Sequence, residues 1–262
     1  MPVYWRGVGR SGVIAMVNAR THRRSLCTSG GALQVLAWLA VAFGLAACSM
    51  SPPKTLRYRL TLEIEVDGVV HTGSSVVETV WYDQSLVKGL AGGIPWVVHA
   101  RGEALIVDLG SRGALFALLT GLATKNRGSD AMYFPDDPEQ VLLAAFGVKG
   151  RASLTPDALE KLSHRRDTVP IPASGLPMLV RFRNIRDPLS VEQVSPDDLA
   201  SSFGAGVKLK RATIAITEAP ITTGVASKLI WLRSLNGGYL TGKHASDVGP
   251  AGTFYSGMFE RS

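Results

Sequence analysis

Cys48 is the residue of this 262-residue chain whose surroundings most clearly imply chemistry. It follows Leu45-Ala46-Ala47 at the end of the run 32–47, in which Gln34 is the only strongly polar residue. A polar segment with two prolines, residues 49–53, comes next. A cysteine thiol can be alkylated, and the small side chains of the two alanines suit a narrow peptidase pocket. This arrangement predicts that Cys48 is modified and that the bond before it is cleaved.

The run Leu45-Ala46-Ala47-Cys48 resembles the lipobox of bacterial lipoprotein precursors. The resemblance implies that diacylglycerol is attached to the Cys48 thiol and that cleavage removes residues 1–47. Cys48 then becomes a lipidated, palmitate-bearing N-terminus that holds the protein in the cell envelope, facing the periplasm. In the sorting rule of such lipoproteins, Asp after the cysteine retains the protein in the inner membrane. Ser49 stands there instead and favours the outer membrane.

The residues before Cys48 have the layout of a secretory signal peptide. Five arginines and no acidic residue occupy the basic n-region, and an apolar stretch of about 16 residues follows it. That stretch is shorter than the ~20 residues that cross a bilayer as a helix. A plain transmembrane anchor and a conventionally cleaved signal are the alternatives. Met16 is an alternative start, and Thr21-His22-Arg23-Arg24 loosely resembles a twin-arginine signal, so the export route stays open.

The net charge of +7 belongs mostly to this leader. Its five arginines leave 23 basic and 21 acidic residues from Cys48 onward, a net charge of +2. A nearly neutral body gives no electrostatic reason to expect nucleic-acid binding. Cys27 leaves with the leader and Cys48 carries the lipid, so we expect no free thiol and no disulfide in the mature chain.

We expect three segments in the chain: a lipoprotein-type signal peptide over residues 1–47, a lipidated N-terminus and spacer over 48–54, and a single domain over 55–262. Basic side chains lie where the spacer meets the domain, namely Lys54, Arg57 and Arg59. Cationic groups near an anionic bilayer contribute about 1 kcal/mol each. These three residues are therefore candidates for contact with the membrane surface, and a solvated strand face is the alternative.

The clearest structural signal is the alternation of apolar and polar residues over Leu56–Val66, which predicts a half-buried strand. Asp67-Gly68 is a preferred pair for a tight hairpin turn, so Val69–Tyr82 should return antiparallel. The register then pairs Val66 with Val69, Leu62 with Gly73, Leu60 with Ser75 and Tyr58 with Val77. Gly73 and Ser75 would leave room on the apolar face for a helix or a large side chain.

The rest of the mature chain predicts both helices and strands. Three helices are expected, over Arg112–Lys125, Pro138–Phe146 and from the cap Thr155 to Leu162, and a short one begins at 195–198 and ends at Gly204. We expect strands at Trp96–Ala100 and Ala104–Leu109 as a second hairpin, and at Pro177–Ile185 and Val207–Thr217. A glycine-rich loop over Lys88–Pro95 and a break over Asn126–Asp130 complete the prediction, with a tail from Asn236 that is read as loop, an edge strand within it being the option left open. The fold class predicted is α+β, a mostly antiparallel sheet with helices packed on one face.

Motifs that would identify a reaction do not occur in the sequence. None of the mature-chain histidines lies three to five residues from another histidine or a cysteine, and there is no H-E-x-x-H or C-x-x-C; they are His71, His99, His164 and His244. No G-x-S-x-G, P-loop or dinucleotide fingerprint occurs either. We therefore predict no metal, no cofactor and no catalytic residue. Whether the protein is an enzyme stays uncertain, with a non-enzyme favoured.

Two weak clusters of charge remain. The first cluster is an acidic stretch whose side chains could serve in acid–base catalysis or bind Ca²⁺. Its residues are Asp187, Glu192, Asp197 and Asp198. The favoured alternative is that they form a turn and the start of a helix. The second cluster is basic and lies on two strands that could be neighbours. Its residues are Arg181, Arg183, Lys208, Lys210 and Arg211. They could bind a phosphate or an acidic polymer, and the favoured alternative is that they make the sheet soluble.

Short runs of the mature chain resemble an uncharacterised family of proteobacterial lipoproteins, and this resemblance implies no activity and no catalytic residue; the runs are 57–61, 72–76, 176–180 and 196–199. We therefore expect a lipid-anchored periplasmic protein with a binding or structural role, whose further partner is an envelope protein or anionic lipid. The alternative is a periplasmic enzyme acting on envelope polymers. A deep pocket with a close carboxylate pair, or with His71 or His99 beside an Asp, would favour the enzyme. A shallow, apolar, exposed patch would favour the binder.

Overall fold

A computed structural model describes residues 51–85, 95–125, 132–243 and 250–262, which belong to the compact unit Ser51–Ser262. Cys48, the signal peptide, all but Pro95 of the predicted loop 88–95 and the predicted break at 126–130 lie outside the described residues.

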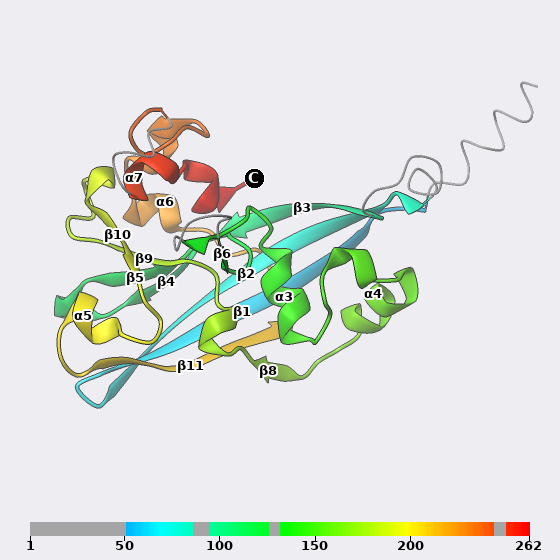
Figure 1. Cartoon of the computed structure of the whole chain (residues 1–262), viewed down its shortest axis with the longest axis horizontal. Coiled ribbons are helices and arrows are strands. Elements are labelled where there is room, and N and C mark those ends of the chain that lie inside the picture. The colour runs from blue at the N-terminus through cyan, green and yellow to red at the C-terminus, as the bar shows by residue number, and fades with distance from the viewer. Residues whose placement is uncertain (1–50, 86–94, 126–131, 244–249) are drawn as a thin grey trace, which may run out of the picture. The chain divides into compact units, whose positions relative to one another are not determined.

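Antiparallel strands make up most of the regular structure (Figure 1). The strands are β1 Lys54–Val66, β2 Val69–Asp83, β3 Trp96–Glu103, β4 Leu105–Asp108, β5 Ala114–Ala117, β6 Thr124–Lys125, β7 Met132–Tyr133, β8 Thr168–Pro170, β9 Leu179–Phe182, β10 Val191–Val194, β11 Val207–Ile216 and β12 Glu260–Arg261. The α-helices are α3 Glu139–Ala145, α4 Pro156–Ser163, α5 Leu199–Phe203, α6 Val225–Lys228 and α7 Pro250–Thr253. The 3₁₀ helices are η1 Gly110–Arg112, η2 Arg151–Ser153, η3 Ala173–Gly175, η4 Pro188–Ser190, η5 Leu232–Leu235 and η7 Ser256–Met258.

The hairpin of β1 and β2 forms as its alternation predicts. Asp67 (φ 49°) and Gly68 (φ 84°) both take left-handed backbone conformations, which matches the twist of a tight hairpin. All four predicted register pairs are confirmed, including Leu62 with Gly73. The apolar residues of β1 are buried and its polar residues are not, so one face of the hairpin belongs to the core. We call this the inner face and the opposite one the outer face.

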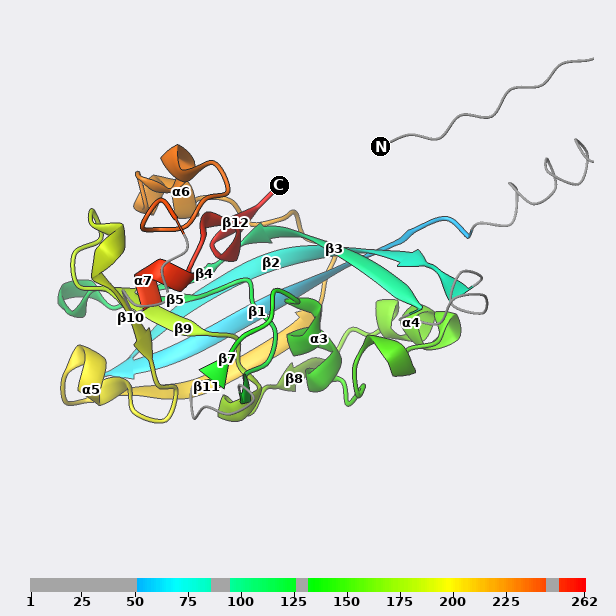
Figure 2. The ribbon, with the colours of Figure 1, turned by 45° about the horizontal axis from the view of Figure 1, so that its top comes forward.

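Strands on both sides of the hairpin extend it into a six-stranded antiparallel sheet with the order β12-β3-β2-β1-β11-β8. β11 runs beside β1 for most of its length, from Tyr58 opposite Ile216 to Val66 opposite Val207. Lys54 and Val66 mark opposite ends of β1, and α4 and α5 lie toward these two ends respectively (Figure 2). The predicted strand at 207–217 is therefore confirmed, with Thr217 just beyond its end.

A four-stranded sheet with the order β10-β9-β5-β4 packs on part of the inner face. Gly73 permits this approach, because a Cβ placed there would lie 2.1 Å from the carbonyl oxygen of Ile106. The room predicted at Gly73 is thus used by the backbone of β4, not by a helix or a large side chain. The prediction of a hairpin between 96–100 and 104–109 was wrong, because β3 pairs with β2 and β4 pairs with β5 in the second sheet.

The helix predicted over Arg112–Lys125 is also wrong, because residues 114–117 form β5. Both faces of the second sheet are covered: Leu115 and Ala117 belong to the cluster that includes β1, and Phe116 belongs to a second cluster. A strand covered on both faces reads as a continuous apolar run, and periodicity alone does not separate it from a buried helix.

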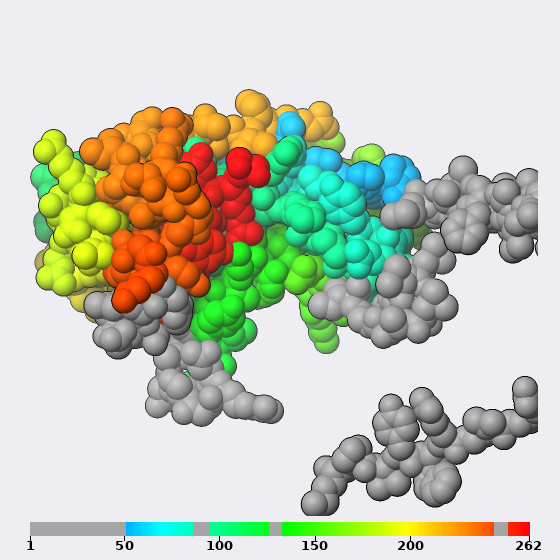
Figure 3. Space-filling model, turned by 90° about the horizontal axis from the view of Figure 1, so that it is seen from above, coloured from blue at the N-terminus to red at the C-terminus, as the bar shows by residue number. Residues whose placement is uncertain are grey.

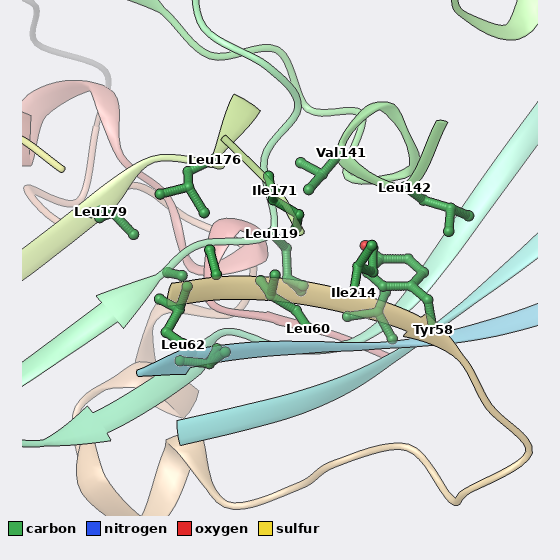
Figure 4. Packing of buried hydrophobic residues seen from close by; sticks show 14 of the residues in the cluster. Tyr58, Leu60, Leu62, Leu119, Val141, Leu142, Ile171, Leu176, Leu179 and Ile214 are labelled. Atoms are coloured by element: carbon green, nitrogen blue, oxygen red, sulfur yellow. The ribbon is translucent and has the colours of Figure 1, made fainter. Parts of the chain in front are cut away.

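The remaining part of the inner-face core contains α3 and α4. Figure 4 shows Val141 and Leu142 of α3 on the same side of the sheet as Tyr58 of β1. Val141 and Leu142 of α3 and Leu159 of α4 are buried in the same cluster as Tyr58, Leu60 and Leu62 of β1. The Thr155 hydroxyl accepts a hydrogen bond from the Ala158 N–H at 3.2 Å, so this predicted cap is confirmed. The helix predicted at 138–146 is confirmed as well.

The C-terminal segment covers the far face of the second sheet. Val225, Leu229, Phe254 and Phe259 are buried against that sheet, and in Figure 3 the orange and red residues form a continuous surface. The carboxylate of Glu103, at the end of β3, accepts a hydrogen bond from the Val225 N–H at 2.6 Å and fixes the start of α6. The tail from Asn236 supplies the short helix α7 and also the edge strand β12 of the six-stranded sheet, so the edge strand predicted as an option for this tail is confirmed.

The architecture shows antiparallel sheets with few and short helices among the described residues, so the α+β class is confirmed at that level. Within the described part of the chain, no helix has the length and apolar character needed to cross a bilayer.

Candidate functional site

Two adjoining hollows form a groove where the second sheet meets the β11 side of the first. Their volumes are about 490 and about 410 Å³, and both are lined by Ala173, Pro196 and Asp197. Leu179 of β9 and Val194 of β10 line the larger hollow, while Val207 and Leu209 of β11 line the smaller one. We call this feature the distal groove. The rigid strands supply its apolar lining and the segments 173–177 and 193–200 supply its rims.

The polar groups of the distal groove do not form a catalytic arrangement. An Asp198 carboxylate oxygen accepts the Ser201 N–H at 3.1 Å and so caps α5. Lys208, on β11, forms an ion pair with Glu65 at 2.9 Å. Asp197, Gln193 and Ser195 are largely exposed at the rim. The groove can therefore bind apolar side chains along its floor and polar groups at its edge, which is the composition of many binding clefts.

The distal groove lies at the opposite end of the hairpin from the start of the domain. Val207 and Lys208 pair with Val66 and Glu65, whereas Lys54 is the first residue of the 13-residue strand β1. At about 3.3 Å per residue, β1 separates these ends by about 40 Å. The groove is thus remote from the segment that connects the domain to Cys48.

The acidic residues singled out in the sequence do not assemble into one site. Asp187 accepts the Leu189 N–H at 2.9 Å and forms a turn, and Asp198 starts α5, so the turn and helix-start interpretation is confirmed. Glu192, on β10, forms ion pairs with Arg181 at 2.7 Å and Arg183 at 2.6 Å.

The basic residues do not form a common site either. The hypothesis that their strands are neighbours was wrong, because Arg181 and the adjoining Arg183 belong to β9 and its extension in the second sheet, while Lys208, Lys210 and Arg211 lie on β11 in the first. Glu192 binds both β9-side arginines, and Arg211 lies 3.6 Å from Glu63. These ion pairs lie along the strands and do not meet in one cluster.

The three basic residues nearest Cys48 in the sequence lie on two different faces of β1. Arg57 and Arg59 are on the outer face, where Arg57 forms a 2.8 Å ion pair with Glu78 of β2. Lys54 has the opposite orientation and forms an ion pair with Glu160 of α4. Arg59 is exposed, and no ion pair joins it to a described residue.

The two histidines that could have indicated an enzyme do not pair with a carboxylate. His71 Nδ1 lies 2.9 Å from the backbone carbonyl oxygen of Asp108, and the carboxylate of Asp108 binds Lys228 at 2.8 Å. This ion pair and the Gly110 N–H hold the pKa of Asp108 below its usual value. His99 stacks edge-on against Tyr82, with ring centroids 5.5 Å apart. Neither histidine has the partner that a general base requires.

Sequence reasoning missed a buried polar cluster at the start of α3. Glu139 is 2% exposed, and its Oε1 lies 3.3 Å from Arg151 Nε without accepting a hydrogen bond from a described residue. Burial raises the pKa of Glu139 to about 7, an effect that Arg151 opposes and Asp137 adds to. Arg151 also pairs with Asp137 at 3.1 Å. Glu139 lines neither hollow of the distal groove, so this cluster lies apart from that site.

Among the described residues, no group of three or more histidine, cysteine, aspartate or glutamate side chains could hold a metal ion. No protein-family model, no curated protein and no solved structure matches the chain.

Proposed function

We propose that this chain is a lipid-anchored periplasmic protein that binds an envelope protein at the end of its domain remote from the membrane. The observation that carries the proposal is the position of the smaller hollow of the distal groove, which lies beside Ile64–Val66 and so about 33 to 40 Å along β1 from Lys54. Cys48 lies only six residues before Lys54, so a lipid on Cys48 tethers one end of the domain. The groove then opens into the periplasm, where a partner can reach it.

The lining of the groove supports a binder over an enzyme. Its partly exposed apolar lining comes from side chains such as Phe134, Ala173 and Pro196, and a few exposed polar groups lie at its rim. General acid–base catalysis needs titratable groups within hydrogen-bond reach of one reacting atom. In the distal groove Asp198 caps α5 and Lys208 pairs with Glu65, so both groups already have partners within the fold. An extended segment of a partner protein can place apolar side chains in the hollows and hydrogen-bond at the rim.

Anchoring and location belong to the same proposal: diacylglycerol on Cys48, export by the signal peptide 1–47, and residence at the outer membrane because Ser49 follows the cysteine. We also propose that α3 and α4 are the helical layer predicted for one face of the sheet, because their buried side chains share a cluster with β1.

Crosslinking in intact cells tests the groove as the binding site. Ser174 is exposed at the groove rim, and Ser174→Trp would fill the hollow without disturbing a buried contact. Ser153 is also an exposed serine in a 3₁₀ helix, but it does not line the groove, so Ser153→Trp is the matched control. We expect one stoichiometric envelope protein to crosslink to the wild type and to Ser153→Trp, and its recovery to fall at least tenfold with Ser174→Trp (about 1.4 kcal/mol of binding). Equal recovery from both variants, or recovery of modified glycan, would contradict the proposal.

A further inference from the structure

The outer face of the sheet carries a patch of cationic and aromatic side chains at the Lys54 end. We call it the anchor-proximal patch, and it consists of Arg57, Arg59, Tyr82, His99 and Arg101. The patch spans three adjacent strands, because Arg57 is opposite Glu78 on β2, and Glu78 is opposite Arg101 on β3. Sequence analysis pointed to Arg57 and Arg59, and the sheet brings Arg101, Tyr82 and His99 beside them.

The exposed charge of this patch is positive because its acidic residue lies beneath the arginines. The Glu78 side chain is 8% exposed, whereas those of Arg57 and Arg101 are 36% and 58% exposed. Glu78 binds Arg57 at 2.8 Å and lies 3.9 Å from Arg101, so it holds both guanidinium groups in place. Arg59 adds a third exposed cation. Glu78 is the one acidic residue among Thr55–Arg59 of β1 and the residues of β2 and β3 that lie opposite them.

Tyr82 adds an amphipathic ring at the edge of the patch. It is 41% exposed and stacks edge-on with His99, so its apolar ring and polar hydroxyl both reach the surface. Tyrosine is enriched at membrane–water interfaces because its ring sits at the level of the lipid headgroups. Cations around an exposed tyrosine are therefore a combination suited to an anionic lipid surface.

The chain length between Cys48 and the domain places this patch close to the bilayer. Six residues extend at most about 20 Å, and Lys54 pairs with Trp81, the neighbour of Tyr82. Electrostatic attraction to the membrane falls off within a Debye length of about 8 Å at physiological salt. The short tether allows the patch to come within that distance of the membrane. Arg211 and Lys208 lie toward the other end of the sheet, where they pair with Glu63 and Glu65.

We infer that the anchor-proximal patch docks the domain onto anionic lipid headgroups of the membrane that holds its lipid anchor. This inference rests on the proposed lipidation of Cys48, which supplies the tether. Docking fixes the orientation of the domain. The Lys54 end of the outer face lies on the bilayer, and the distal groove is turned toward the periplasm. Each arginine contributes about a fivefold factor to the docking equilibrium.

Site-specific fluorescence on the mature, lipidated protein in vesicles tests the inference. The mature chain has no cysteine besides the lipidated Cys48, so a single introduced cysteine takes one dye. Tyr82→Cys places the dye in the patch, and Val70→Cys places it near the hairpin turn at nearly the same exposure, 40% against 41%. Gln84→Cys is a second reporter at the patch end that leaves the tyrosine intact. Nitroxide-labelled headgroups in the vesicles quench a dye that approaches them.

We expect quenching at positions 82 and 84, but not at 70, in vesicles of phosphatidylcholine mixed with phosphatidylglycerol, and weaker quenching in phosphatidylcholine alone. Replacing both Arg59 and Arg101 by Gln should lower the docking equilibrium about 25-fold. The matched control is Arg211→Gln, because Arg211 has nearly the same side-chain exposure as Arg101 (60% against 58%) and also faces a glutamate. This control should leave quenching unchanged.

Two outcomes would overturn the inference, and they are distinguishable. Protein that stays on the vesicles but shows equal quenching at 70, 82 and 84, or no response to the Arg59 and Arg101 replacements, would refute docking and leave the lipid anchor standing. Protein that does not remain with vesicles of either composition would refute the anchor, and docking with it.

Discussion

Single residues in this domain are held by polar contacts that the sequence pattern does not reveal. Glu139 reads as a surface residue at a helix start, yet it is 2% exposed beside Arg151. Thr79 lies in an apolar strand, and its hydroxyl is fully buried and hydrogen-bonded on both sides. Because buried polar groups are costly when they lose a partner, these two positions give sharp tests of the structure.

Replacing Glu139 by Gln should remove a pH dependence of stability. The pKa of Glu139 is raised from 4.5 to about 7, so the folded state binds the extra proton between these values. Stability from this group is fully present below about pH 4.5 and is lost as the pH rises through 7, by about 3 kcal/mol. We expect Glu139→Gln to be at least as stable as the wild type at about pH 8, and to lack the slope.

Urea unfolding between about pH 5 and 8 measures this effect. The exposed Glu218→Gln is the control and should keep the wild-type profile. Parallel profiles for wild type and Glu139→Gln would contradict the buried environment of Glu139.

Thr79→Val should destabilise the hairpin although the two side chains have the same shape. The Thr79 hydroxyl donates to the Leu56 carbonyl at 3.0 Å and accepts from Trp81 Nε1 at 2.9 Å. Valine leaves a buried indole N–H without its partner, which costs about 1–3 kcal/mol. Thr79→Ser keeps the hydroxyl and should retain the Trp81 fluorescence maximum of the wild type. If Thr79→Val unfolds at the wild-type urea concentration, this pair of hydrogen bonds does not contribute.

At the scale of elements, the long hairpin was predictable and the second sheet was not. β1 has one solvated face, so its alternation and the Asp67-Gly68 turn predicted strand, turn and register. β5 is covered on both faces and was mistaken for a helix. β8 and β10 have only three and four residues, too few to show a period.

The candidate site was likewise predictable only in part. The distal groove is built where β9, β10 and β11 come together from two sheets, and no local pattern encodes that meeting. Of the patch residues, Arg57 and Arg59 were found from their place beside the spacer. Arg101 joins them only through the pairing of β3 with β2.

The contact between the two sheets depends on the missing side chain of Gly73. Gly73→Ala would place a Cβ 2.1 Å from the Ile106 carbonyl oxygen and 2.9 Å from Val107 Cγ2. β2 and β4 must then separate, and overpacking of this kind costs about 1–3 kcal/mol or more. Gly175→Ala is the control, because its Cβ would meet Ile171 at an ordinary 3.4 Å. Thermal unfolding of both variants decides the matter, and equal Tm values would refute the close packing of β4 on β2.

At the scale of the whole domain, the length of β1 separates two tasks. One end begins six residues after Cys48 and carries the anchor-proximal patch, and the other lies beside the smaller hollow of the distal groove, about 33 to 40 Å away. A tether at one end and a binding groove at the other are what a lipid-anchored binding protein needs. Under the proposal, the orientation of the domain depends on the lipid attached to the Cys48 sulfur.

Metabolic labelling with radioactive palmitate tests that dependence most directly. We predict that the wild-type protein is labelled and sediments with the outer membrane. The Cys48→Ser variant should take up no label. It should also keep its signal peptide, because the cysteine must be lipidated before the signal peptide is cleaved. An unlabelled wild type, or a Cys48→Ser variant labelled as strongly as the wild type, would contradict the account.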